Sequence, residues 1–243
     1  MTSANDLSGI TTAILVGGLG TRLRSAVADR PKVLAEINGR PMLSYLLDQV
    51  AQAGVRRVVF CTGYRGEQVQ AAFGTRYGAL QLEYSQEPTP HGTAGAIRLA
   101  LPVLQSDPVL AMNGDSVCEA DLRAFYTWHC GRGASASLLL TFTPDVARYG
   151  QVQTDPDGKV RSFQEKGSVT GLGWINAGIY LLSRASIETI PLDRAVSIER
   201  EMFPAWIGQD LYGYQSQGRF LDIGTPESYA EAANFFSAQG QSA

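Results

Sequence analysis

The sequence is poor in the residues that several common kinds of site require. Its three cysteines, Cys61, Cys118 and Cys130, form no C-x-x-C pair. We therefore expect neither a disulfide framework nor a structural zinc site, and we expect thiols that pack as small core residues in a reducing compartment. No apolar run approaches the roughly 18 residues of a membrane span, and the N-terminal segment MTSANDLSGI lacks the apolar stretch of a signal peptide. These absences predict a cytoplasmic protein that has no membrane partner.

Basic residues and histidines are also scarce. The 243 residues include 20 Lys or Arg and 23 Asp or Glu, a net charge of −3 that argues against a nucleic-acid partner. Only Lys32, Lys159 and Lys166 are lysines, and the two histidines, His91 and His129, form no convincing Ser-His-Asp or Cys-His arrangement. Hydrophobic residues make up 44% of the chain, enough for an ordinary buried core. The oligomeric state, monomer or homo-oligomer, stays open.

Apolar runs and helical patterns alternate through the first part of the chain. Expected strands cover residues 12–16, 55–62, 80–86 and 109–113, and expected helices cover 41–53, 66–73, 93–104 and 121–130. Such a succession predicts right-handed βαβ units and a largely parallel sheet.

After about residue 116 the sequence pattern favours more antiparallel strand pairing. Expected strands cover 134–142, 174–182 and 220–223, a D-P-D-G turn joins 151–154 to 160–164 as a hairpin, and expected helices cover 197–206 and 226–236. The start of the first of these helices, Ser197-Ile198-Glu199-Arg200, indicates a capped terminus with a charged face rather than a site. We expect one α/β domain over residues 1–243, with halves at 1–115 and 116–243.

A glycine-rich loop follows the first expected strand. The segment LVGGLGTRL at 15–23 places Gly17, Gly18 and Gly20 where the backbone can turn tightly and approach a ligand. It lacks the lysine of a Walker loop, and Leu23 stands where a dinucleotide fingerprint needs Gly or Ala. Four basic residues lie close behind these glycines on a net acidic chain: Arg22, Arg24, Arg30 and Lys32. The loop therefore predicts a polyphosphate-binding site.

This loop and later segments resemble the sugar-1-phosphate nucleotidyltransferases. The family's small-G-G-x-G-T-R-L signature and following P-K match residues 16–23 and Pro31-Lys32. Further matches follow in the family's order at 86–88, 92–96, 113–115, 149–150, 165–166, 176–178 and 222–226. The resemblance implies a Rossmann-like, three-layer α/β/α fold with a mixed, mainly parallel sheet. It also implies a reaction in which an NTP and a sugar 1-phosphate give an NDP-sugar and pyrophosphate.

The same resemblance implies roles for individual residues. As catalytic groups, Arg22 would hold the β- and γ-phosphates, Lys32 the α-phosphate and Lys166 the sugar phosphate. The implied nucleotide-binding residues are Val16, Gly17, Gly18, Gly20, Thr21, Gln86, Gly92 and Thr93, and the implied sugar contacts are Gly150, Glu165 and Asn176. Mg²⁺ is the implied cofactor, with Asp115 and Asp222 as its ligands.

Within this family, the details resemble the D-glycero-α-D-manno-heptose 1-phosphate guanylyltransferases. The matching features include Arg148-Tyr149-Gly150 and Ser116 directly after Asn-Gly-Asp. The resemblance implies GTP and that heptose 1-phosphate as substrates. Uridylyl or thymidylyl transfer to an N-acetylmuramate, glucose or mannose type of sugar 1-phosphate is the alternative. An inactive nucleotide-sugar-binding regulatory protein is a further one.

Overall fold

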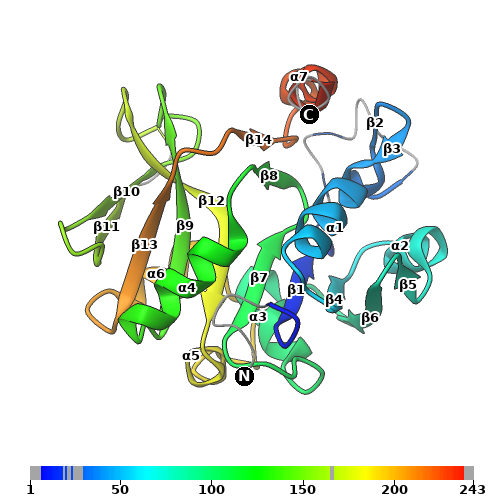
Figure 1. Ribbon diagram of the computed structural model, residues 1–243, viewed down its shortest axis with the longest axis horizontal. Helices are drawn as coiled ribbons and strands as arrows, with labels where there is room; N and C mark the ends of the chain where they lie inside the picture. The colour runs from blue at the N-terminus through cyan, green and yellow to red at the C-terminus, as the bar shows by residue number, and fades with distance from the viewer. Residues whose placement is uncertain (1–6, 19, 21–22, 24–29, 165–166, 238–243) are drawn as a thin grey trace.

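The computed structural model describes residues 7–18, 20, 23, 30–164 and 167–237. Its main feature is an eight-stranded sheet in the order β13-β9-β12-β7-β1-β4-β6-β5 (Figure 1). Parallel pairing joins β1 (Thr11–Leu15), β4 (Arg57–Thr62), β6 (Leu80–Gln86) and β7 (Val109–Asn113). Antiparallel pairing joins β12 (Gly173–Leu182) to β7 and to β9 (Ala136–Thr143). The prediction of a mixed, mainly parallel sheet is confirmed.

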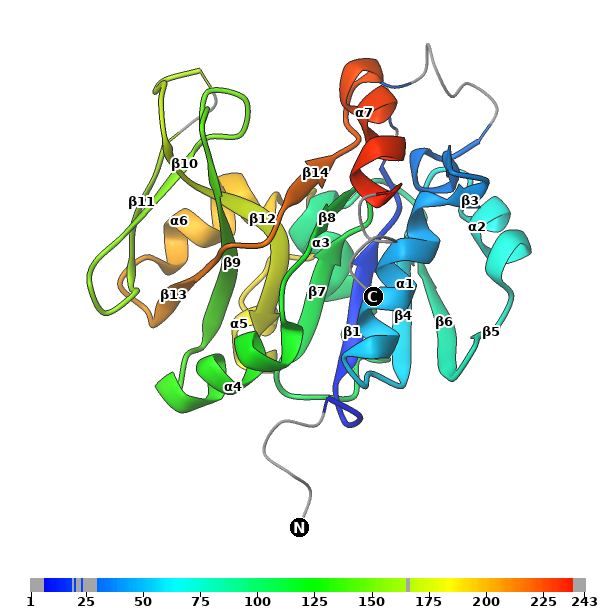
Figure 2. The ribbon, with the colours of Figure 1, turned by 45° about the horizontal axis from the view of Figure 1, so that its top comes forward.

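Apolar side chains cover both faces of the sheet. Successive residues of a strand point to opposite faces, and accordingly Ile14 belongs to one buried cluster and Ala13 to the other. The first cluster includes Leu43 of α1 (Met42–Gln52), and the second includes Ile97 of α3 (Gly92–Ala100). Figure 2 shows α1 on the near side of the sheet and α3 behind it. The three-layer α/β/α prediction is therefore confirmed.

Shorter elements complete the chain. They are η2 (Lys32–Leu34), β2 (Glu36–Ile37), β3 (Arg40–Pro41), α2 (Gly66–Phe73), β5 (Arg76–Tyr77), β8 (Ser116–Cys118), α4 (Leu122–Arg132), β10 (Gln151–Thr154), β11 (Val160–Gln164), α5 (Arg184–Glu188), η3 (Ile198–Met202), α6 (Phe203–Trp206), β13 (Leu211–Ser216), β14 (Phe220–Asp222) and α7 (Pro226–Ser237). Most expected elements are present, and the D-P-D-G hairpin pairs β10 with β11.

Several regions of the second half differ from expectation, and β8 and α5 have no counterpart among the expected elements. The helix expected over 197–206 is a π-helical turn, η3, followed by α6. Pro204 lies at the start of α6 and has no N–H to continue a regular helical ladder. No strand is predicted over Leu211–Ser216, where the structure has β13. A Cβ at Gly213 would lie 2.6 Å from Leu140 Cδ1, so this glycine lets β13 pack closely on β9.

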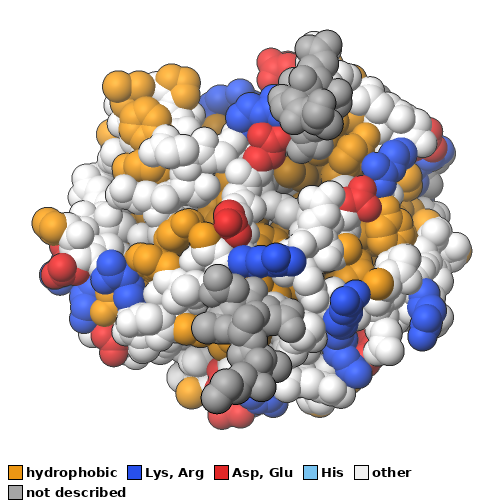
Figure 3. All heavy atoms as spheres, in the orientation of Figure 1, with side chains coloured by type: hydrophobic (Ala, Val, Ile, Leu, Met, Phe, Trp, Pro, Cys, Tyr) orange, Lys and Arg blue, Asp and Glu red, His pale blue; other side chains and the backbone are white. Residues whose placement is uncertain are grey.

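The surface carries charges of both signs. On the face shown in Figure 3, basic and acidic side chains are interspersed, and those of the described residues form no continuous basic patch there. Several pair directly, such as Arg219 with Glu119 and Arg161 with Asp155 (2.6 Å). Within the described ranges, no helix combines the length and apolar character needed to cross a bilayer.

Candidate functional site

A cavity of about 780 Å³ lies where the parallel strands end. Its walls include the last residues of β1, β6 and β7, namely Leu15, Gln86 and Asn113, and the loops that follow them. The carboxyl edge of a parallel sheet is where ligands bind in open α/β folds. The cavity is therefore the candidate site.

The glycine loop forms one wall of this cavity. Val16, Gly17, Gly18 and Gly20 all line it. A Cβ at Gly17 would lie 3.0 Å from both Glu87 Oε1 and Gly63 N, so a side chain there would crowd these neighbours and a glycine passes them most easily. Gly20 has φ +56°, a left-handed conformation that suits glycine. Thr21 and Arg22, which we predicted beside this loop, lie outside the described residues.

Two aspartates meet at one end of the cavity through a short antiparallel ladder. Strand β14 pairs with β8 in a register that sets Asp222 opposite Ser116, and Ile223 N donates to Asp115 O (3.1 Å). No side chain fits at Gly114, which precedes Asp115, because a Cβ there would lie 2.5 Å from Leu15 O. The ladder thus joins two carboxylates that are far apart in the sequence.

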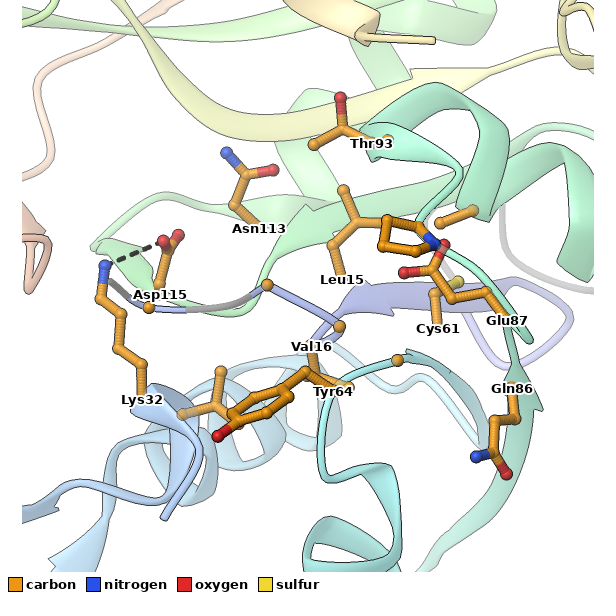
Figure 4. Close-up of a pocket in the computed structure, with 18 of the residues that line it drawn as sticks. Leu15, Val16, Lys32, Cys61, Tyr64, Gln86, Glu87, Thr93, Asn113 and Asp115 are labelled. Atoms are coloured by element: carbon orange, nitrogen blue, oxygen red, sulfur yellow. Dashed lines mark hydrogen bonds and ion pairs between the residues drawn. The ribbon is translucent and has the colours of Figure 1, made fainter. Parts of the chain in front are cut away.

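Lys32 lies between these carboxylates. Its Nζ is 2.9 Å from Asp115 Oδ2, a contact drawn in Figure 4, and 3.6 Å from Asp222 Oδ1. The Lys32 side chain is only 10% exposed, whereas those of Asp115 and Asp222 are 45% and 25% exposed. The cluster is therefore a half-buried charge centre that combines one cation with two acceptor groups.

The acidic pair suits a magnesium ion. Mg²⁺ prefers carboxylate oxygens and is commonly held by one or two carboxylates together with substrate phosphates and water. Asp115 and Asp222 both lie within reach of one ammonium group, so a small cation could contact both. The described part of the chain has no cluster of three or more acidic, histidine or cysteine ligands. The donor set thus fits a metal that is also bound by substrate rather than an all-protein cage.

The loop after β6 supplies a carboxylate that we did not single out from the sequence. Glu87 Oε2 accepts a hydrogen bond from His91 N (2.9 Å), while Oε1 lies beside Gly17 and Gly63. In Figure 4 the Glu87 carboxylate points toward the other labelled residues, and the exposed Gln86 side chain points away from them. The sequence signal is present, since Glu87 belongs to the matched Gln-Glu-Pro segment, but the chemistry of this segment is predicted at its neighbour Gln86 instead.

Gly92 and Thr93 also line the cavity, and both connect it to the second half of the chain. Gly92 has φ +73°, and a Cβ there would lie 2.5 Å from Val196 O. The Thr93 hydroxyl accepts a hydrogen bond from Ile198 N (2.8 Å), and Ala94 N donates to Val196 O (3.0 Å). The start of α3 is therefore joined directly to the start of η3.

Neither Cys61 nor His129 is suited to act as a nucleophile or base at this site. Cys61 lines it, but burial, with a smaller contribution from the charge of Glu87, raises the pKa of this thiol to about 12. His129 is outside the cavity lining and contacts Ser137 Oγ (2.8 Å), and burial lowers its pKa to about 4. A neutral thiol is a poor nucleophile. The site thus relies on charge and position rather than on a cysteine or histidine.

The second half contributes Glu199 to the cavity, which we did not predict. Ser197 Oγ accepts from Arg200 N (3.2 Å), as expected of a cap, but Glu199 faces the cavity instead of forming part of a merely solvated face. Gly150 and Asn176 lie outside the cavity lining, although Asn176 Nδ2 donates to Glu199 Oε1 (3.2 Å). Glu165 and Lys166 lie outside the described residues.

Comparisons with known proteins identify relatives of this chain along nearly its whole length. The nucleotidyl transferase family profile matches residues 11–239. The D-glycero-alpha-D-manno-heptose 1-phosphate guanylyltransferase of Aneurinibacillus thermoaerophilus is 37% identical, over 90% of this chain and 95% of that protein. The mannose-1-phosphate guanylyltransferase of Mycobacterium tuberculosis is 36% identical, and the match covers 92% of this chain and 64% of that relative.

Solved structures of similar proteins share the fold of this chain. HddC from Yersinia pseudotuberculosis superposes with a TM-score of 0.84 at 32% identity, covering 93% of this chain and 99% of that chain. Its complex with GMP-PN superposes with a TM-score of 0.83. The matched profile and the extent of these alignments establish that the chain belongs to the nucleotidyl transferase family.

Proposed function

We propose that this chain transfers a guanylyl group from GTP to a sugar 1-phosphate, with D-glycero-α-D-manno-heptose 1-phosphate as the preferred acceptor. The observation that carries the proposal is the Lys32, Asp115 and Asp222 cluster at the end of a cavity lined by the glycine loop. Support for the acceptor comes from the heptose 1-phosphate guanylyltransferase, of which the alignment covers 95%. Residues 1–115 would then form the nucleotide-binding half and 116–243 the sugar-phosphate-binding half.

The reaction needs alignment and charge neutralisation more than acid–base chemistry. A phosphate oxygen of the sugar 1-phosphate forms a bond to the α-phosphorus of GTP, and the bond from that phosphorus to the β-phosphate oxygen breaks. Pyrophosphate carries away the electron pair. The attacking oxygen is already anionic, so no base is required, in keeping with the position of both histidines outside the cavity lining.

Each charged residue then has a place in the transfer. Lys32 balances the charge that develops at the α-phosphate, because the ammonium of this largely buried side chain is fixed by two carboxylates. The glycine-loop amides and Arg22 hold the departing phosphates, and Lys166 holds the attacking phosphate. Asp115 and Asp222 would hold Mg²⁺, which when bound neutralises phosphate charge.

Glu87 supports guanine as the base. Guanine presents an adjacent N1–H and N2–H₂ on one edge, and an ionised carboxylate offers only acceptors. Adenine places an acceptor nitrogen at the corresponding position, and uracil or thymine offers one N–H between two carbonyls. Glu87 Oε1 has no hydrogen-bond partner among the described residues, and it lies beside the glycine loop. We propose that it accepts from guanine, while Gln86, Gly92 and Thr93 shape the remainder of the base site.

The sugar contacts proposed from the sequence are Gly150, Glu165 and Asn176. A second acceptor, mannose 1-phosphate, is favoured by the 36% identity to the mycobacterial enzyme over 92% of this chain. One panel separates these possibilities: four NTPs against heptose, mannose, glucose and N-acetylmuramate 1-phosphates, with pyrophosphate release as the readout. We expect GTP with the heptose to give the highest kcat/KM. A preference for UTP or dTTP contradicts guanylyl transfer, and binding of nucleotide sugars without turnover supports the regulatory alternative.

A further inference from the structure

A buried hydrogen-bond network in the second half of the chain ends at the cavity on Glu199. Asn176 Nδ2 donates to the Tyr180 hydroxyl oxygen (2.9 Å) and to Glu199 Oε1 (3.2 Å), and the Tyr180 hydroxyl donates to the same carboxylate oxygen (3.3 Å). Tyr180 is fully buried, whereas Glu199 is exposed to the cavity. Two donors thus fix one oxygen of an accessible carboxylate.

The orientation of Asn176 follows from a third contact. Gly178 N donates to Asn176 Oδ1 (2.9 Å), which identifies the amide oxygen, because an amide nitrogen cannot accept this bond. The amide has two N–H groups, and Tyr180 and Glu199 take both of them. Asn176 therefore has no donor left for a ligand, and its contacts place it behind Glu199 rather than on the cavity surface.

As far as the described residues show, the second oxygen of Glu199 is available to a ligand. Among the described residues, both hydrogen bonds to this carboxylate go to Oε1, and Oε2 has neither a hydrogen bond nor an ion pair. A carboxylate oxygen accepts hydrogen bonds and repels phosphate. Among the groups of a sugar 1-phosphate, its natural partner is therefore a ring hydroxyl.

The backbone around Glu199 is also held in place. Ile198 N donates to Thr93 Oγ1 (2.8 Å), and Ser197 N donates to Glu201 Oε1 (2.9 Å). These contacts attach the start of η3 to α3, which lies on the side of the cavity proposed for the base, the base side. From β12, Asn176 and Tyr180 hold the Glu199 side chain. The carboxylate is thus fixed from two sides, as a selective contact requires.

We infer that Glu199 Oε2 accepts a hydrogen bond from a ring hydroxyl of the sugar 1-phosphate, and that Asn176 and Tyr180 are positioning residues that hold Glu199 for this contact. The inference rests on the proposed function, since it takes a sugar ring to occupy this cavity. It also changes the role of Asn176, from a direct sugar contact to a support for one.

Substrate analogues test this inference directly. GTP is kept saturating, and kcat/KM is measured for the best sugar 1-phosphate of the panel and for its analogues lacking one hydroxyl each. For the wild type, one analogue should lose about 10- to 100-fold, the value of a hydrogen bond to a charged group. In Glu199→Gln, Asn176 and Tyr180 retain the amide oxygen and a donor replaces Oε2. With the full substrate, kcat/KM of this variant should also be about 10- to 100-fold below that of the wild type. Its kcat/KM values for the full substrate and for the sensitive analogue should differ by less than about threefold.

Two further variants sharpen the test. Glu201→Gln neutralises a carboxylate of the same turn that is not part of the cavity lining, while its amide oxygen can still accept from Ser197 N, and it should discriminate among the analogues as the wild type does. Tyr180→Phe removes one donor to Glu199, and it should raise KM for the full substrate with kcat within about twofold while weakening discrimination against the same analogue. Glu199→Asp, which keeps the charge but shortens the side chain, replaces Glu199→Gln if that variant does not fold.

The outcomes are separable. If the wild type turns over no sugar 1-phosphate, the proposed function fails and the Glu199 assignment fails with it. If the wild type is active and Glu199→Gln still distinguishes every analogue as the wild type does, the Glu199 assignment alone is overturned. Reduced kcat in Tyr180→Phe with unchanged discrimination contradicts the positioning role.

Discussion

The two sides of the cavity are built in different ways. On the base side, the ends of neighbouring parallel strands deliver Val16, Glu87 and Asn113 to one edge of the sheet. On the opposite side, Asp222 arrives through the β8–β14 ladder and Glu199 through a π-helical turn. The first side follows from regular topology. The second depends on irregular elements, each of which is fixed by particular contacts.

This difference bears on how the sides respond to change. Strand ends are held by continuous ladders, so a side-chain substitution there should alter binding without moving the backbone. The position of Glu199 depends on Asn176, Tyr180 and Thr93. Substitutions of these supporting residues should therefore also alter binding in the cavity. Substitutions on the two sides can test whether this contrast holds.

The largest effect is expected at the charge centre where the two sides meet. Lys32→Met removes the ammonium between Asp115 and Asp222, and kcat should fall about 10³-fold because charge at the α-phosphate loses its partner. Lys159→Met is the matched control, since Lys159 pairs with Asp210 at the surface (3.1 Å). Pyrophosphate release measures both variants, and equal kcat values would contradict the role of Lys32.

On the base side, Glu87→Gln should lower kcat/KM for GTP about 100-fold and change that for UTP by less than about threefold. The amide replaces one of two acceptors with a donor that opposes guanine N–H groups. Glu83→Gln, on β6 directly before the loop of Glu87 and paired with Arg57 (2.9 Å), serves as control. A larger loss in Gln86→Ala than in Glu87→Gln would assign base selection to Gln86 instead.

In the second half, acid should weaken folding through His129. Burial lowers its pKa from 6.5 to about 4, so between these values the unfolded chain binds a proton that the folded chain does not. The full stability is present above pH 6.5 and decreases as pH falls toward 4, by about 2 kcal/mol at pH 5. Urea unfolding at pH 8 and pH 5 measures this difference, which should shrink in His129→Gln and persist in His91→Gln. An unchanged difference in His129→Gln would remove His129 as the cause.

The smallest effect is expected at the bridge between the two sides. Thr93→Val removes the acceptor for Ile198 N and should reduce, by about threefold to tenfold, the factor by which a sugar 1-phosphate tightens nucleotide binding. Calorimetry with a GTP analogue that has a non-cleavable α,β linkage gives this factor. Thr93→Ser keeps the hydroxyl and should give the same factor as the wild type. Equal factors for Thr93→Val and the wild type would show that the bridge carries no coupling.

The same contrast explains what the sequence could and could not predict. Alternating apolar runs specify buried strands, and glycines directly after one of them specify a ligand loop, so the sheet and the wall at Gly17 and Gly18 were predictable. Glu199 was missed because Ser197 does cap its turn, and the cap signal says nothing about which way the following side chain faces. Asn176 was placed at the sugar because its chemistry suits hydroxyls, but its donors are used within the protein. Such assignments depend on contacts between distant segments.

The most direct test of the central claim is ³¹P NMR of GTP and D-glycero-α-D-manno-heptose 1-phosphate mixed with the protein and Mg²⁺. We predict one GDP-sugar and one pyrophosphate for each GTP consumed, with the rate about 10³-fold lower in Asp115→Asn. Hydrolysis of GTP without a sugar diphosphate, or an undiminished rate in Asp115→Asn, would contradict the account.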